Sequence, residues 1–155
     1  MWKFLIFRLL VGGFVTVYVP YFILSLHPES APTLLSIFTI TGVFLIAVGV
    51  WVFLRCIWDF AFVGQSDNPT ILVSRGTYKF MRNPMYAGLV LILLAESLLF
   101  RSWRLAVCTA TFWLSAHLMV ILYEERTLAI KFGTSYEQYC KEVPRWIPRV
   151  RRSAS

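Results

Sequence analysis

Long apolar runs separated by short polar segments make up most of the chain. Four runs have helical length: residues 4–26, 33–62, 85–100 and 102–123. At a rise of about 1.5 Å per residue, the first, second and fourth can cross a hydrocarbon core of about 30 Å, whereas the third is short. The pattern therefore predicts an all-α membrane protein with about four transmembrane helices.

The polar positions after the fourth run predict one more, shorter helix. Gly133 is a plausible helix stop, and "TSYE" is a capping-box pattern in which Thr134 caps the next helix and Glu137 reaches back. Helical spacing gives this helix one apolar face, made of Tyr136, Tyr139, Cys140 and Val143. Pro144 and Pro148 then impose an extended tail. We expect a short C-terminal amphipathic helix on the cytoplasmic side.

The start of the third run combines a capping residue with a proline. Asn83 can act as the N-cap, and Pro84 suits the first helical position. Unpaired N–H groups of the first turn, with Arg82 beside them, could receive a carboxylate or phosphate. The alternative is that Arg82 and Lys79 mark the cytoplasmic boundary and that the neighbouring tyrosines belong to an aromatic belt.

Composition supports the membrane interpretation. Hydrophobic residues make up 58% of the 155 positions, against roughly 45 to 50% in a soluble domain, and the mean hydropathy is +0.67. We expect one domain over residues 1–155, with the first run retained as a span because its apolar part exceeds a signal peptide and lacks a cleavage site. The three cysteines lie far apart and form no metal-binding motif, so we interpret them as small apolar residues.

The net charge of +7 is better explained by orientation than by nucleic acid, because the basic residues bracket the apolar runs. With a cytoplasmic N-terminus, the outside carries only Arg101 and Arg104. The inside carries Lys3, Arg8, Arg75, Lys79, Arg82, Arg126, Lys131, Lys141, Arg145, Arg149, Arg151 and Arg152. Both termini are thus predicted to be cytoplasmic, with the functional face formed by residues 64–84 and 124–150. A bacterial inner membrane is our expected location.

Two carboxylates, Glu124 and Glu125, follow directly on the fourth apolar run. Alone they could be a solvated helix end that pairs with Arg126 or Lys131. Together with an anion-receptive helix start and a tyrosine-rich segment on one face, they suit a ligand that carries hydroxyls, an aromatic ring and a carboxylate. S-adenosylmethionine has all three groups.

Several polar residues within the runs have simpler interpretations. His117 is expected to be packed or hydrogen-bonded. Glu96 and Asp59 are ionisable groups in or near spans and so are candidates for function, although Glu96 lies near the outer end, where Arg101 or Arg104 could pair with it. Gly42 and Gly49 share one side of the second run and predict close helix packing.

Two blocks, "SRGTYKFMRNPMYAG" and "LYEERTLAIKFGTSYEQYCKEVPRWIP", resemble the isoprenylcysteine carboxyl methyltransferase and phospholipid methyltransferase superfamily of membrane enzymes. The resemblance implies methyl transfer from S-adenosylmethionine. It implies that Glu124 binds the cofactor, that Glu125 is its companion, and that the tail closes the pocket. The predicted cofactor-binding residues are Thr70, Ile71, Leu72, Val73, Tyr78, Arg82, Asn83, Pro84, Met85, Tyr86, Glu124, Tyr136 and Tyr139.

The chain departs from the carboxyl-methylating branch at two positions. Asn83 stands where that branch has the His of Arg-His-Pro, and Val120 stands where it has an Arg that faces the acceptor carboxylate. Arg145 could supply the missing cation, and "LYEE" is also close to phosphatidylethanolamine methyltransferases.

We narrowly favour a carboxylate on a lipid or lipidated small molecule as the acceptor. N-methylation of a phospholipid amine is the runner-up, for which Glu125 is a candidate proton acceptor. An NADPH-dependent membrane reductase and a non-enzymatic four-span accessory subunit are less favoured. No nucleic acid and no obligate protein partner are expected.

Overall fold

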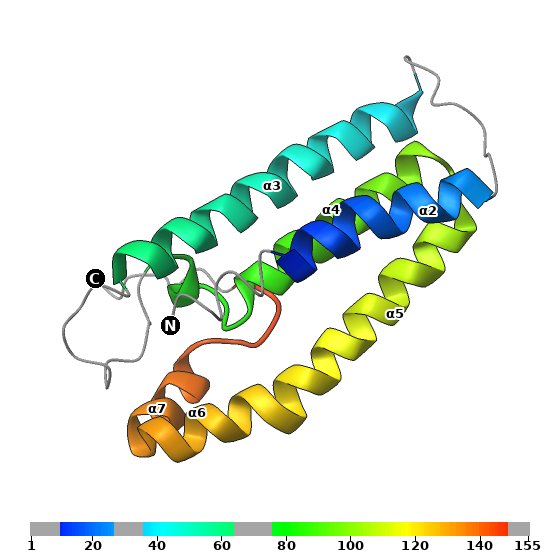
Figure 1. The fold of residues 1–155 in the computed structure, drawn as a ribbon. Helices are drawn as coiled ribbons and strands as arrows, with labels where there is room; N and C mark the ends of the chain where they lie inside the picture. Colours follow the sequence, from blue (N-terminus) through cyan, green and yellow to red (C-terminus); the bar gives the residue numbers. More distant parts are fainter. Residues whose placement is uncertain (1–9, 27–35, 64–75, 149–155) are drawn as a thin grey trace.

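A computed structural model describes residues 10–26, 36–63 and 76–148, and all regular structure within these ranges is helical. A continuous helix over Leu10–Leu26 contains the π-helical turn η1 (Phe14–Tyr18) and ends in α2 (Val19–Leu26). The remaining elements are α3 (Ile37–Val63), the 3-10 turn η2 (Gly76–Lys79), α4 (Pro84–Leu99), α5 (Trp103–Met119), the π-helical turn η3 (Val120–Glu124), α6 (Glu125–Phe132) and α7 (Thr134–Glu142). The all-α prediction is confirmed for this part of the chain (Figure 1).

Two of the described helices are long and apolar enough to cross a membrane. They are Ile37–Asp59, with 23 residues, and Trp103–Phe132, with 30 residues. Leu10–Leu26 and Pro84–Leu99 are apolar but shorter; the 16 residues of α4 span only about 24 Å. The first predicted run begins at Phe4, outside the described residues. Two spans are therefore supported, and the number of four stays a prediction.

Helices α3 and α4 pack closely because small residues line their contact. A Cβ atom added to Gly42 would lie 2.6 Å from Cγ of Leu99, and one added to Gly49 would lie 2.9 Å from the carbonyl oxygen of Gly88. Only hydrogen at these positions lets the two backbones approach so far. The predicted packing role of Gly42 and Gly49 is confirmed.

A tight turn follows α4, and Ser102 caps the start of α5. Helix α5 runs back along the molecule and continues without a break through η3 and α6 to Phe132. Gly133 ends this helix with a φ of +52°, as predicted. The predicted capping box is wrong: Thr134 is already the first residue of α7, and the preceding Gly133 occupies the cap position without a side chain. One glycine therefore serves both as helix stop and as next cap.

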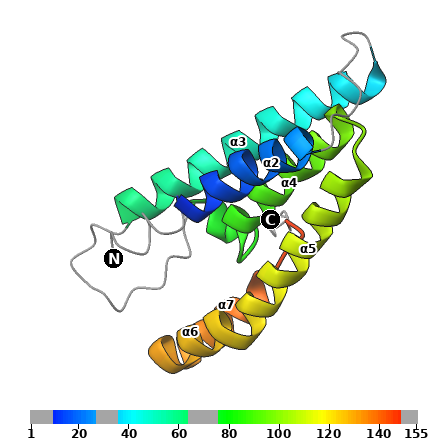
Figure 2. The same cartoon turned by 45° about the vertical axis from the view of Figure 1, so that its right-hand side comes forward.

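The two views of the fold show how the candidate site is assembled. Helices α4 and α5 lie together near their connection and diverge toward their far ends (Figures 1 and 2). There, the segment after α7 crosses back toward the start of α4. This return brings the C-terminal motif block against the first block, although they are far apart in sequence.

Candidate functional site

The start of α4 is covered by the C-terminal tail. Pro84 occupies the first turn and Asn83 the cap position, as predicted, but the Asn83 side chain makes no capping hydrogen bond. Its Nδ2 instead donates to the carbonyl oxygen of Arg145 at 3.3 Å, and the backbone N–H of Arg82 donates to the carbonyl oxygen of Pro144 at 2.9 Å. The predicted cap position of Asn83 is confirmed, whereas the capping hydrogen bond from its side chain is not formed. The first turn of α4 therefore lacks the side-chain cap that Asn83 was expected to provide.

The predicted residues Tyr86 and Glu124 contact one another. The Tyr86 hydroxyl donates to Oε1 of Glu124 at 2.7 Å, which connects the first turn of α4 to the end of η3. Pro84 and Met85, immediately before Tyr86, are buried. This contact joins the two sequence blocks within the site.

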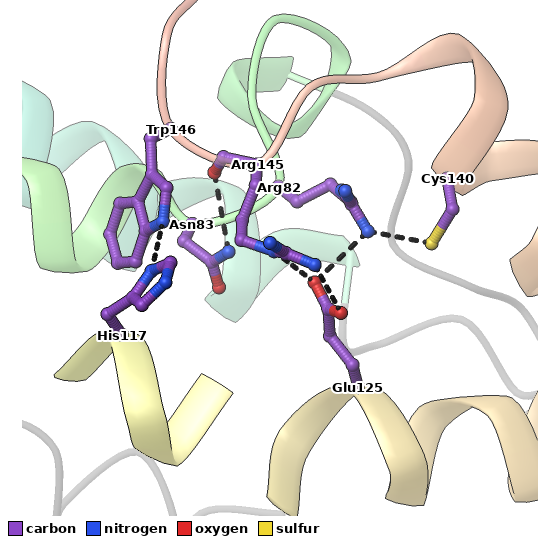
Figure 3. A network of polar contacts seen from close by, with 7 residues as sticks. All are labelled: Arg82, Asn83, His117, Glu125, Cys140, Arg145 and Trp146. Carbon is purple, nitrogen blue, oxygen red and sulfur yellow. Dashed lines mark hydrogen bonds and ion pairs between the residues drawn. The ribbon is translucent and has the colours of Figure 1, made fainter. Parts of the chain in front are cut away.

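Glu125 lies at the centre of a charged cluster drawn from three segments (Figure 3). Arg145 of the tail donates to both of its carboxylate oxygens, at 2.7 and 2.9 Å, and Arg82 donates to Oε1 at 3.1 Å. Arg82 also contacts Sγ of Cys140 at 2.8 Å. These hydrogen bonds to Glu125 raise the pKa of the Arg145 guanidinium. We call Arg82, Glu125 and Arg145 the ion-pair cluster.

Helix α7 turns its predicted apolar face inward. Tyr136 and Val143 are buried, and Tyr139 and Cys140 are half-buried, so the predicted face is confirmed. The Tyr139 hydroxyl donates to the carbonyl oxygen of Tyr78 at 2.8 Å. Burial raises the pKa of Tyr136, and it raises the pKa of Tyr139 to about 12. Both phenols are therefore neutral near pH 7.

Trp146 anchors the tail to the fourth apolar run, a role that the sequence pattern did not reveal. Its indole N–H donates to Nδ1 of His117 at 2.9 Å, and the imidazole stacks on Trp113 with ring centroids 5.3 Å apart. The prediction of a packed, hydrogen-bonded His117 is confirmed. The sequence does contain a hint of this contact. The indole of Trp146 can only donate a hydrogen bond, and the imidazole of His117, on an apolar helix, can accept one.

The remaining candidates fall elsewhere. Glu96 lies near the far end of α4 and does not join this cluster; its Oε2 has no hydrogen-bond partner among the described residues, while Arg101 donates to Ser36 at 2.7 Å. Asp59 is buried at the end of the second run. Thr70, Ile71, Leu72 and Val73 lie outside the described residues.

A groove of about 500 Å³ lies between α6 and α7 beside the ion-pair cluster. Its walls are formed by Ile121, Glu125, Arg126, Ala129, Tyr136, Glu137, Cys140 and Lys141. Glu125 thus belongs to the ion-pair cluster and also lines the groove, together with Tyr136.

Comparison with known proteins places the chain in a family. The sequence profile of the phospholipid methyltransferase family matches residues 37–135, which include the helices α3 to α6 and, within the site, Arg82, Tyr86, Glu124 and Glu125. The chain belongs to the phospholipid methyltransferase family. It is also similar to a protein-S-isoprenylcysteine O-methyltransferase of Schizosaccharomyces pombe, with 32% identity over 80 residues, 52% of this chain and 34% of the relative. The chain thus spans about a third of the length of that curated relative.

The residues of the site fit S-adenosylmethionine, the cofactor that the family implies. The cofactor carries a carboxylate, which the first turn of α4 can accept because Asn83 does not cap it. It also carries an ammonium group and ribose hydroxyls, for which Glu124 offers a carboxylate. The aromatic rings of α7 offer apolar cover for a base.

Proposed function

We propose that this phospholipid methyltransferase family member transfers a methyl group from S-adenosylmethionine to a lipid-like acceptor at one end of its apolar helices. The observation that carries the proposal is the contact between Tyr86 and Glu124, because it joins the two motif blocks in one site. The family match covers both residues.

The chemistry asks mainly for orientation and exclusion of water. When bound, S-adenosylmethionine supplies an electrophilic methyl group that an in-line nucleophile can take. In our proposal, the first turn of α4 and Glu124 hold the polar parts of the cofactor. The inward face of α7 and the tail from Pro144 to Trp146 cover the site, and such closure favours reaction by positioning the partners away from water.

The ion-pair cluster has a bracing role in this proposal. Glu125 binds Arg82, which precedes α4, and Arg145 in the tail, so it holds the covering segment against the start of α4. The sequence-based prediction that Glu125 accepts a proton would use Oε2, which takes one of these three hydrogen bonds, whereas Oε1 takes two.

A carboxylate on a lipid or lipidated small molecule is our first candidate for the acceptor. It is supported by the similarity to an isoprenylcysteine O-methyltransferase and by the position of Arg145 beside the start of α4. A guanidinium fork suits a planar carboxylate. Arg145 would have to exchange Glu125 for the acceptor.

A phospholipid amine is the second candidate, and one observation favours it. Both oxygens of Glu125 already occupy the fork of Arg145, and Val120, where the carboxyl-methylating branch has an Arg, is buried and apolar. An amine acceptor would need no cation from the protein.

Cofactor binding tests the proposed function directly. The purified full-length protein in detergent is expected to bind S-adenosylhomocysteine in calorimetric titrations and to bind NADPH weakly. Saturable NADPH binding without a response to S-adenosylhomocysteine would indicate a reductase. Absence of both responses would favour an accessory subunit.

A further inference from the structure

Asp59 is a buried carboxylate that the proposed chemistry does not use. It lies near the end of α3, with a side chain only 7% exposed. A carboxylate is costly to bury unless hydrogen bonds or a charge compensate it. Its partners therefore indicate why an acid stands at this position.

Asp59 contacts Thr77 of the turn that precedes α4 and Arg55 of its own helix. The backbone N–H and the hydroxyl of Thr77 both donate to Oδ2 of Asp59, at 2.8 and 2.9 Å. Nε of Arg55 lies 3.6 Å from Oδ1, and Sγ of Cys56 lies 3.5 Å from the Thr77 hydroxyl. Two short hydrogen bonds to one carboxylate oxygen hold the turn η2 against α3.

Gly76 permits this close approach. Its φ is +63°, a conformation that residues with a Cβ rarely adopt, and an added Cβ would collide with the Asp59 carboxylate. In the turn, Thr77 supplies two donors to Asp59 of α3, and Gly76 leaves room for the carboxylate. Asp59, Thr77 and Gly76 therefore all favour the same backbone conformation of the turn.

The residue after Thr77 connects this arrangement to the site. The carbonyl oxygen of Tyr78 accepts the hydroxyl hydrogen of Tyr139 from α7. A continuous series of contacts therefore runs from Asp59 through Thr77 and Tyr78 to Tyr139. It links the second apolar run to the helix that covers the proposed cofactor site.

We propose that Asp59 is a positioning residue that fixes η2, and through Tyr78 and Tyr139 the placement of α7 over the cofactor site. This inference rests on the proposed function, because the ligand is the proposed cofactor. Asp59 acts through the turn and does not contact the cofactor or the reacting atoms. Its loss should therefore weaken binding without removing any binding group.

The first experiment compares variants of the turn in the full-length protein. Asp59→Ala and Thr77→Val should each raise the Kd for S-adenosylhomocysteine by about tenfold, the change that corresponds to 1.4 kcal/mol, and Thr77→Ser should restore it. Thr111→Val is the matched control, because the Thr111 hydroxyl is exposed and donates to Val107 of its own helix, and it should leave Kd unchanged. Unchanged Kd in both Asp59→Ala and Thr77→Val would overturn the inference.

A second measurement needs no ligand. Lys79 is exposed at the end of η2, so trypsin should cleave after it several-fold faster in Thr77→Val than in the parent protein or in Thr77→Ser. Mass spectrometry identifies the cut. An equal cleavage rate would contradict a role for these hydrogen bonds in holding the turn, and Thr77→Val keeps this test available if Asp59→Ala does not fold.

A double-mutant cycle separates positioning from general stability. If Asp59 acts through Tyr139, the variant Asp59→Ala with Tyr139→Phe should bind about as weakly as the weaker single variant, because both break one series of contacts. Additive losses, or losses that follow the melting temperature alone, would overturn the inference. Failure of the parent protein to bind would instead count against the proposed function, while the trypsin result would still decide the role of Asp59.

Discussion

Glu124 is the residue whose replacement tests the proposed cofactor site most directly. Glu124→Gln keeps an acceptor for the Tyr86 hydroxyl but removes the negative charge. Loss of a charged hydrogen bond is worth roughly 1.5 to 3 kcal/mol, so Kd for S-adenosylhomocysteine should rise on the order of tenfold or more. Calorimetry on the purified variant measures this change.

Glu96→Gln is the matched control for that substitution. Glu96 lies near the opposite end of α4, away from the ion-pair cluster, and its Oε2 makes no hydrogen bond to the described residues. We expect its replacement to leave cofactor affinity unchanged. Equal losses in the two variants would contradict the proposed position of the site.

Tyr139 should ionise later than an ordinary tyrosine. Burial disfavours the phenolate and raises its pKa to about 12 from the usual 10.0. The proton of this phenol is bound more tightly in the folded state, so its contribution to stability is fully present below pH 10 and is lost as the pH rises toward 12.

A spectrophotometric titration checks the Tyr139 prediction. The tyrosinate absorbance of the parent protein minus that of Tyr139→Phe reports the ionisation of Tyr139. This difference should rise with a midpoint near pH 12. A midpoint near 10 for the Tyr139 difference would show that the phenol is solvated and that α7 does not cover the site.

The close contact between the helices α3 and α4 fixes the position of α4, whose first turn belongs to the candidate site. Gly49→Ala would place a Cβ 2.8 Å from Ile92 and 2.9 Å from the carbonyl oxygen of Gly88. Because a backbone carbonyl cannot rotate away as a side chain does, the helices must separate, at a cost of about 1 to 3 kcal/mol. We expect a lower melting temperature in detergent and weaker cofactor binding.

Gly13→Ala is the control for the helix contact. It introduces the same methyl group in a helix where the added Cβ would meet no atom of another described segment within 4 Å. Its melting temperature should be unchanged or slightly higher, since alanine favours a helix over glycine. A similar loss in both variants would mean that close packing is not the reason for glycine at position 49.

The whole molecule in its membrane decides the acceptor. Membranes that contain the protein are incubated with S-adenosylmethionine labelled in the methyl group, and the extracted products are treated with mild alkali. Methyl esters release methanol under base, whereas N-methyl groups stay attached. We expect base-labile label, reduced in Arg145→Ala by a larger factor than the affinity of that variant for S-adenosylhomocysteine.

The opposite outcome has an equally specific meaning. Base-stable label in phospholipid would refute the carboxylate hypothesis and support the amine. Membranes prepared without the protein provide the background. Base-labile label that Arg145→Ala leaves unchanged would keep the carboxylate acceptor but assign its recognition to another residue.

Local rules predicted the elements of this protein well. Apolar runs predicted the helices, Gly133 their interruption, and the spacing of Tyr136, Tyr139, Cys140 and Val143 the inward face of α7. These features depend on periodicity and on the conformational preference of single residues. Local rules failed at two caps: Asn83 occupies the cap position but binds the tail without a capping hydrogen bond, and Gly133 takes the cap position predicted for Thr134.

The sequence by itself thus determined an apolar, all-helical chain with two charged motif blocks, because hydrophobic periodicity and capping chemistry act over a few residues. Only the tertiary structure decided which charges meet. Arg145 pairs with Glu125, 20 residues earlier, Trp146 binds His117, and Asp59 receives Thr77. Such pairings depend on how the tail and turns return to the helices, and distance along the chain carries no information about that return.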